Sequence, residues 1–105
     1  MFVAKVTGSV VATQKVEEIV GSKLMVVEPY RLEASKRKSL DTTGRTFVAI
    51  DTIGAGVGDF VLIVQGSSSR LTAQTKGMPV DALIIGIVDT VHVENNCVFN
   101  RESNE

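Results

Sequence analysis

Stretches of β-branched and other apolar residues recur along the chain, and turn-forming residues separate them. Short apolar runs bounded by Gly, Pro, Asn and Asp indicate strands rather than helices. The pattern predicts strands over residues 2–13, 23–30, 46–51, 59–65 and 82–93, with a short last strand at 98–99. Gly8 predicts a bulge or bend in the first strand, and Pro29 predicts the end of the second.

One short helix is expected over residues 67–74, where a serine supplies the N-cap. The polar stretch from residue 31 to residue 45 is expected to be a surface loop. Five bent strands, with one short helix before the last long strand, are typical of a small OB-like barrel. We therefore predict an all-β fold in which residues 1–99 form one domain and residues 100–105 a polar C-terminal tail.

The last long predicted strand also bears on the oligomeric state of the protein. Its residues 83–88 read Leu-Ile-Ile-Gly-Ile-Val and are apolar at successive positions, so both faces of the strand require cover. The barrel interior covers one face, and a neighbouring copy is the simplest cover for the other. Burial of apolar surface at roughly 25 cal/mol per Å² favours such association, which predicts a homo-oligomer.

Composition narrows the class of protein. The 105 residues suffice for one domain, and 44% of them are hydrophobic, which is typical of a globular chain. The net charge of −1 gives no long-range attraction for nucleic acid or anionic lipid. Cys97 is the single cysteine, which excludes an internal disulfide and a cysteine-rich zinc site. With no apolar segment of membrane-spanning length, we expect a soluble cytoplasmic protein that does not bind membranes.

The glycine-rich stretch Gly54-Ala55-Gly56-Val57-Gly58 resembles a phosphate-binding loop at first sight. A dinucleotide fingerprint, however, requires G-x-G-x-x-G followed by a helix. The spacing here is G-x-G-x-G, and a predicted strand follows. These glycines are therefore expected to connect two strands, by supplying positive φ or by allowing two backbones to approach closely.

Other polar residues give no pattern of a catalytic or metal site. The run Gly66-Ser67-Ser68-Ser69-Arg70 lacks the lysine of a P-loop and favours a helix cap or a subunit contact. His92 and Cys97 alone make neither a metal site nor a nucleophile with its base. Turn and cap roles account for the four aspartates that flank strands, Asp51, Asp59, Asp81 and Asp89. We expect no enzyme activity, no cofactor and no metal.

A basic cluster is the one hint of nucleic-acid binding, because OB barrels often bind single strands. It comprises Arg31, Lys36, Arg37, Lys38 and Arg45. Single-strand sites add exposed aromatic platforms to a basic groove. The aromatic residues here lie mostly in apolar strand patterns, where a core role is favoured: Phe2, Tyr30, Phe47, Phe60 and Phe99.

Four segments, taken in order, resemble the EutN/CcmL family, the vertex proteins of bacterial microcompartment shells. They are residues 4–15, residues 49–62, the run from Gly66 to Arg70, and residues 79–89. Any one of these motifs is weak, but four in the same order over nearly the whole chain are specific. Ser69 departs from the family, in which alanine is common at this position. The stretch 30–45 is longer and more basic than is typical.

The resemblance implies an OB-like barrel that forms a ring, usually a pentamer, without catalytic activity. The ring would close shell vertices, with hexameric shell proteins as its partners and the shell in the cytoplasm as its location. By motif position, the expected subunit-interface or central-opening residues are Gly54, Ala55, Gly56, Gly58, Ser67, Ser68 and Arg70. Arg31, Lys36, Arg37 and Lys38 form a possible contact loop for the shell or its cargo. The alternative function is an OB-fold single-strand nucleic-acid binder.

Overall fold

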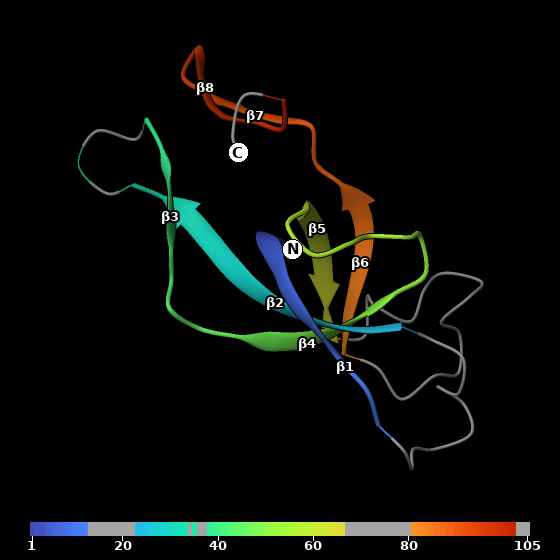
Figure 1. Cartoon of the computed structure of the whole chain (residues 1–105). Coiled ribbons are helices and arrows are strands. Elements are labelled where there is room, and N and C mark those ends of the chain that lie inside the picture. The colour runs from blue at the N-terminus through green and yellow to red at the C-terminus, as the bar shows by residue number, and fades with distance from the viewer. Residues whose placement is uncertain (13–22, 34, 36–37, 67–80, 103–105) are drawn as a thin grey trace.

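The computed structural model describes residues 1–12, 23–33, 35, 38–66 and 81–102 (Figure 1). These residues form eight strands: β1 (Phe2–Val10), β2 (Lys23–Leu32), β3 (Leu40–Thr42), β4 (Phe47–Asp51), β5 (Phe60–Gln65), β6 (Ala82–Ile87), β7 (Thr90–Val93) and β8 (Asn96–Asn100). The expected all-β class is confirmed. The helix predicted over residues 67–74 lies outside the described residues.

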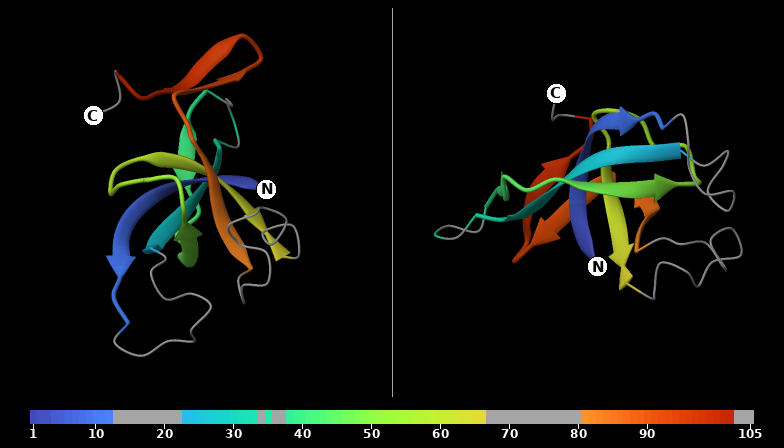
Figure 2. Two further views of the ribbon diagram at one scale, coloured as in Figure 1. Left: turned by 90° about the vertical axis from the view of Figure 1, so that its right-hand side faces the viewer. Right: turned by 90° about the horizontal axis from the view of Figure 1, so that it is seen from below.

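Five strands close into a barrel. The strand order β1-β5-β6-β4-β2 is completed by direct pairing of β1 with β2, which leaves the barrel without an open edge. All of these pairs are antiparallel except β4 with β6, which run parallel over two partner positions. The predicted five-stranded barrel is therefore confirmed, and Figure 2 shows its curvature from two further directions.

Alternate residues of the barrel strands point inward, as the period of a strand requires. They form one buried cluster, to which Ala55 of the glycine-rich loop also belongs. The members of the cluster are Ala4, Val6, Met25, Val27, Ala49, Ala55, Val61, Ile63, Ala82 and Ile84. The small side chains among them let the strands of a tightly curved barrel approach one another.

Gly8 forms the expected irregularity in β1. The register of β1 against β2 shifts between Val6 and Gly8, which is a β-bulge. A Cβ on Gly8 would lie 3.8 Å from the Cβ of Val26, an ordinary contact, so bending of the strand explains this glycine better than steric need. The bulge bends β1 around the barrel.

Several predicted strand boundaries were wrong. β1 ends at Val10, short of the predicted residue 13. β2 does not end at Pro29 but continues to Leu32, because the carbonyl of Pro29 accepts hydrogen bonds from the backbone N–H and the hydroxyl of Thr43 at 3.1 and 2.9 Å. These bonds align β3, whose partner residues in β2 run from Tyr30 to Leu32. The stretch predicted as a surface loop therefore contains a short strand, and β2 and β3 together form an arm that extends from the barrel (Figure 1).

The predicted long strand over residues 82–93 is two strands. β6 ends at Ile87, and β7 begins at Thr90 in a separate hairpin with β8. Val88 still donates its N–H to the carbonyl of Phe60 at 2.8 Å, after which the chain leaves the barrel. The turn of this hairpin has positive φ at Glu94 and Asn95, and β8 is longer than the predicted 98–99 strand.

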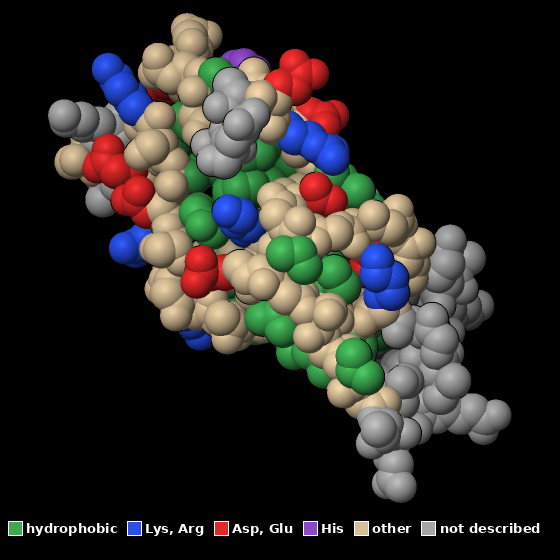
Figure 3. Space-filling model, in the orientation of Figure 1, with side chains coloured by type: hydrophobic (Ala, Val, Ile, Leu, Met, Phe, Trp, Pro, Cys, Tyr) green, Lys and Arg blue, Asp and Glu red, His purple; other side chains and the backbone are tan. Residues whose placement is uncertain are grey.

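The hairpin packs on the barrel through aromatic rings. Phe99 of β8 lies 4.1 Å, between ring centroids, from Phe60 of β5, and Tyr30 of β2 meets Phe60 edge-on at 5.1 Å. Hydrophobic side chains are visible in the hollow between the hairpin and the barrel (Figure 3). A two-stranded hairpin is marginal by itself, so this contact holds it in place.

The two faces of β6 are covered unequally within the chain. Ile84 points into the core, and Leu83 packs with Ile50 in a second buried cluster on the other face. The expectation that this whole second face requires a neighbouring copy was therefore too broad. Ile85 is the residue of β6 that stays exposed, at 37% of its surface.

Candidate functional site

The glycine-rich loop joins the end of β4 to the start of β5. Gly54 and Gly58 adopt φ of 93° and 97°, which residues with a side chain rarely adopt. The strand β5 begins at Phe60, directly after the loop, so no helix N-terminus follows the glycines. The expectation of a strand-to-strand connection with positive φ is confirmed.

Hydrogen bonds fix the second half of this loop against β1. Gly58 donates its N–H to the carbonyl of Val6 at 2.8 Å, and Val6 donates to the carbonyl of Asp59 at 2.9 Å. The carboxylate of Asp59 accepts the N–H of Gly56 at 2.9 Å. The loop and the bulged strand therefore form one unit. Positive φ, not close approach of two backbones, accounts for Gly54 and Gly58, because a Cβ on either would have no atom within 4 Å.

A buried aspartate fixes the first half of the loop. Asp51 ends β4 and is 3% exposed, and its Oδ1 accepts the N–H of Ile53 at 3.1 Å. The ammonium of Lys23 lies 3.4 Å from Asp51 Oδ2 and donates to the carbonyl of Ala55 at 3.0 Å. One lysine thus links β2, the end of β4 and the loop. Sequence reasoning missed this link because strand register brings together two residues that are distant in sequence.

The fixed loop presents apolar side chains to solvent. Ala55 is fully buried, whereas Ile53 and Val57 are 47% and 67% exposed. Exposed apolar side chains on a backbone fixed by hydrogen bonds lose little conformational entropy when they bind. This arrangement offers a contact surface rather than a cradle for a small ligand.

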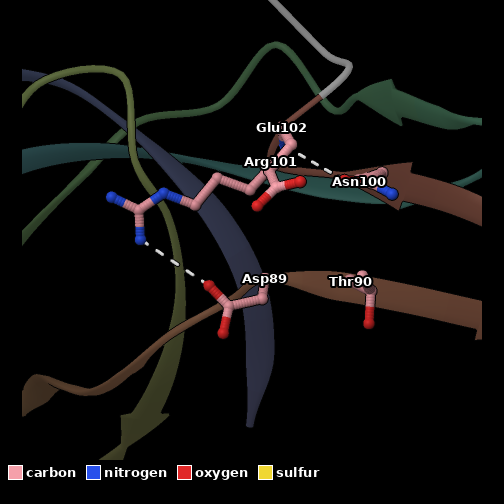
Figure 4. A pocket seen from close by; sticks show the side chains of 5 residues that line it. All are labelled: Asp89, Thr90, Asn100, Arg101 and Glu102. Carbon is pink, nitrogen blue, oxygen red and sulfur yellow. Dashed lines mark hydrogen bonds and ion pairs between the residues drawn. The ribbon is translucent and has the colours of Figure 1, made fainter.

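A polar pocket of about 680 Å³ lies at the base of the β7–β8 hairpin (Figure 4). Its lining residues are Asp89, Thr90, Asn100, Arg101 and Glu102. The guanidinium of Arg101 lies 3.7 Å from Asp89 and 3.5 Å from Asp59 of the glycine-rich loop. Its charge is therefore already matched by carboxylates, and the arginine links the hairpin to the loop. No local sequence pattern indicates this link, because it depends on how the hairpin packs against the loop.

Other candidate residues are only partly brought together. Arg31 is the cross-strand partner of Asp41 in the arm, and Lys38 lies near the end of the arm. Lys36, Arg37, Ser67, Ser68 and Arg70 lie outside the described residues. The structure therefore places neither the full basic cluster nor the serine-rich segment.

The five aromatic residues are engaged within the protein, as a core role requires. Phe60 and Phe99 are buried, and Tyr30 contacts Phe60. Phe2 and Phe47 pack against the core with ring centroids 5.9 Å apart, and the Arg45 guanidinium lies 5.6 Å from the Phe47 ring.

His92 and Cys97 are cross-strand partners in the hairpin, both exposed. The Cys97 thiol donates to the carbonyl of Phe99 at 3.2 Å. Within the described ranges, no three His, Cys, Asp or Glu side chains gather in a way that would hold a metal ion. The same ranges contain no helix with the length and apolarity needed to cross a membrane.

The fold and the loop define the class of protein: a small closed β-barrel whose glycine-rich loop exposes apolar side chains. Comparison with known proteins then gives the particular family. Residues 1–89 match the model of the family described as ethanolamine utilisation protein EutN/carboxysome. The chain belongs to this EutN/CcmL family.

Relatives in the family are similar along almost their whole length. The carboxysome shell vertex protein CcmL of Synechococcus elongatus is 40% identical, with 96% of each chain covered. The microcompartment shell vertex protein EutN of Salmonella typhimurium is 39% identical, with 96% of each chain covered. Both names describe vertex proteins of shells.

Solved structures agree with the fold. CcmL of Gloeobacter violaceus has a TM-score of 0.84 at 33% identity, with 97% of this chain and 99% of that chain covered. GrpN of Rhodospirillum rubrum, described as a pentameric microcompartment shell protein, has a TM-score of 0.74 at 41% identity. That match covers 89% of this chain and 99% of GrpN.

Proposed function

We propose that this chain is a structural protein of a bacterial microcompartment shell, and that a ring of five copies closes each vertex of the polyhedron. The observation that carries the proposal is the agreement of family, length and fold with shell vertex proteins, among them a pentameric one. A sheet of hexagonal units is flat, so its closure into a polyhedron requires pentagonal units. The protein acts by shape and contact, without catalysis, in the shell within the bacterial cytoplasm.

The glycine-rich loop supports this role as a subunit contact. Gly54, Ala55, Gly56 and Gly58 shape a loop that is bonded to β1 and β2, so its outer surface is preformed. We assign Ser67, Ser68 and Arg70 to the subunit contact or to the rim of the central opening, by their position in the family motif.

Hexameric shell proteins are the proposed partners around the outside of the ring. The β2–β3 arm extends from the barrel (Figure 1) and carries Arg31, with Lys36, Arg37 and Lys38 in the connection from β2 to β3 in sequence. We assign its basic residues to contact with neighbouring shell subunits or cargo. Neutralising Lys36, Arg37 and Lys38 together should change shell assembly or composition, and unchanged shells would remove this assignment.

Single-strand nucleic-acid binding is the alternative that the barrel raises. It requires aromatic platforms, and the aromatic residues here pack against protein, which favours the structural role. A salt titration with a fluorescent oligonucleotide separates the two functions. Steeply salt-dependent binding by a monomer would favour the alternative.

Deletion of the gene, followed by electron microscopy of the compartments, tests the proposed function. Loss of the vertex protein should leave elongated or open shells, because the pentagonal closures are missing. Normally closed polyhedra, in a strain with no paralogue to replace the protein, would overturn the proposal.

A further inference from the structure

The β2–β3 arm carries a serine directly after three consecutive basic residues. In the sequence, Ser39 follows Lys36, Arg37 and Lys38, and β3 begins at the next residue. The chain has no other run of three basic residues. Lys38 and Ser39 are both exposed. Ser39 therefore lies on an exposed part of the arm (Figure 1), next to a charge pattern that precedes no other serine of the chain.

Pairing within the arm determines which residues share a face with Ser39. Glu33 donates its N–H to the carbonyl of Ser39 at 2.8 Å, and Arg31 is the cross-strand partner of Asp41. Ser39 therefore lies opposite Glu33, two residues along from the Arg31–Asp41 pair. Since residues two apart in a strand point to the same side, Arg31 is the diagonal neighbour of Ser39, at roughly 7–8 Å between Cα atoms. An arginine side chain is long enough to reach a group attached to the Ser39 oxygen.

Ser35 lies in the same connection between β2 and β3 but differs from Ser39 in its surroundings. Its N–H and its hydroxyl both donate to the carboxylate of Glu33. It also precedes the basic run, and its nearest upstream basic residue is Arg31, four positions away. Ser35 is therefore an internal comparison: a serine on the same arm without basic residues directly before it.

We propose that Ser39 is a phosphorylation site for a protein kinase that selects serines preceded by basic residues. Kinases distinguish their substrates by charge patterns of this kind, so a run of basic side chains gives specificity to a serine on the surface. The modification concerns the arm itself and does not depend on the vertex role.

The reaction transfers a phosphoryl group from a nucleoside triphosphate, ATP bound to Mg²⁺. Ser39 Oγ attacks the γ-phosphorus, and the hydroxyl proton passes to the carboxylate base of the kinase. The bond from that phosphorus to the β–γ bridging oxygen breaks, and ADP leaves. The segment must extend to enter the kinase, which requires opening of the bond between Glu33 and Ser39. Local opening at the end of a two-stranded arm costs little free energy.

Phosphorylation changes the charge of the arm in a defined way. Phosphoserine carries about −1.5 to −2 charges at pH 7, which offsets much of the positive charge of Lys36, Arg37 and Lys38. The phosphate would lie diagonal to Arg31, whose guanidinium can bind two of its oxygens, and opposite the carboxylate of Glu33, which repels it. The modification therefore acts as an electrostatic switch on the basic surface of the arm.

A kinase assay on the full-length protein tests the proposed site. The probe is the catalytic subunit of cyclic-AMP-dependent protein kinase with Mg²⁺ and ATP, because this enzyme selects serines that follow basic residues. We expect one phosphate per chain, which fragmentation mass spectrometry should place on Ser39. Ser39→Ala should abolish the labelling. Ser35→Ala, the matched control in the same connection, should be labelled at the rate of the unmodified protein.

A second variant tests whether the basic run directs the kinase. Replacement of Lys36, Arg37 and Lys38 together by glutamine keeps Ser39 and removes the charges before it. Its kcat/KM as a substrate should fall by roughly tenfold or more, because the kinase loses the contacts that distinguish this serine from others. Circular dichroism of each variant checks that the fold is retained, so that loss of labelling is assigned to the site.

The protein isolated from the bacterium that makes it provides the test in cells. With phosphatase inhibitors present during lysis, intact-mass spectrometry should show a fraction of chains heavier by one phosphate, which phosphatase treatment removes. Four outcomes would overturn the proposal. They are labelling that persists in Ser39→Ala, an unchanged rate in the glutamine variant, no labelling while a standard basic peptide is phosphorylated, and a cellular protein without phosphate under every growth condition.

Discussion

Lys23 and Asp51 face each other across β2 and β4, with the ammonium 3.4 Å from a carboxylate that is fully buried. The lysine side chain is 56% exposed, so it reaches the aspartate from the solvent side. Its donated bond to Ala55 attaches the glycine-rich loop to the same pair. The pair therefore couples the closure of the barrel to the shape of the loop that we assign to subunit contact.

Removal of the lysine should cost more stability than neutralisation of the aspartate. Lys23→Met leaves the Asp51 carboxylate buried without its counter-charge, which we expect to destabilise the fold by about 1–3 kcal/mol. Asp51→Asn keeps an oxygen for the N–H of Ile53 and removes the buried charge, so its cost should be smaller. Urea unfolding at one fixed protein concentration measures both changes. Equal destabilisation by the two variants would show that the ion pair is not the source.

Gly58 and Gly56 lie in the same loop and should respond differently to alanine. Gly58 has φ of 97°, so Gly58→Ala is strained and should destabilise the protein by roughly 1–2 kcal/mol. Gly56 lacks positive φ, and a Cβ there would lie 3.9 Å from its nearest neighbour, Asp59 Oδ2. Gly56→Ala should therefore be close to neutral. Thermal melting of the two variants provides the comparison, and an equal loss in both would contradict it.

Phe99 should hold the β7–β8 hairpin in its folded position against the barrel. The side chain is 6% exposed and packs against Phe60 with ring centroids 4.1 Å apart, so Phe99→Ala removes an aromatic contact between hairpin and barrel. We expect a loss of about 3 kcal/mol in stability. In hydrogen exchange, the amides of β7 and β8 should lose protection while those of β1 and β5 keep theirs. Uniform loss across the chain would mean that the hairpin and barrel unfold together.

Arg101 should matter much less than Phe99, although it links the hairpin to the glycine-rich loop. Its guanidinium is half exposed and lies 3.5 Å or more from both carboxylates. Ion pairs in this setting contribute about 1 kcal/mol or less. Arg101→Gln should shift the unfolding midpoint only slightly, and the shift should shrink further in high salt. A loss as large as that of Phe99→Ala would contradict this ranking.

The barrel could be predicted from the sequence because each of its strands is either an alternation of apolar and polar residues or a continuous apolar run. Turn-forming residues separate these segments. Gly8 and the glycines at 54 and 58 marked a bulge and a connection, and the structure has both. The boundaries at Pro29 and Val88 could not be read in this way, because bonds to Thr43 and to Phe60 decide them. Both partners are distant in sequence and become neighbours only in the fold.

Some features of the candidate site could likewise be predicted from the sequence, and others depend on the fold. The glycine spacing excluded a nucleotide loop, because that chemistry depends on local residues and the helix that follows them. The roles of Lys23, Asp59 and Arg101 depend on pairing register and on hairpin packing, which leave no local pattern. The solvent-exposed fraction of a side chain distinguishes apolar residues of the core from apolar residues available for contact. This fraction is known only from the folded structure.

Native mass spectrometry of the purified, unmodified protein tests the central claim most directly. The account predicts one dominant species at five times the 11.2 kDa mass of the chain, stable on dilution into the low micromolar range. A protein that stays at the mass of one chain at every concentration would contradict the account.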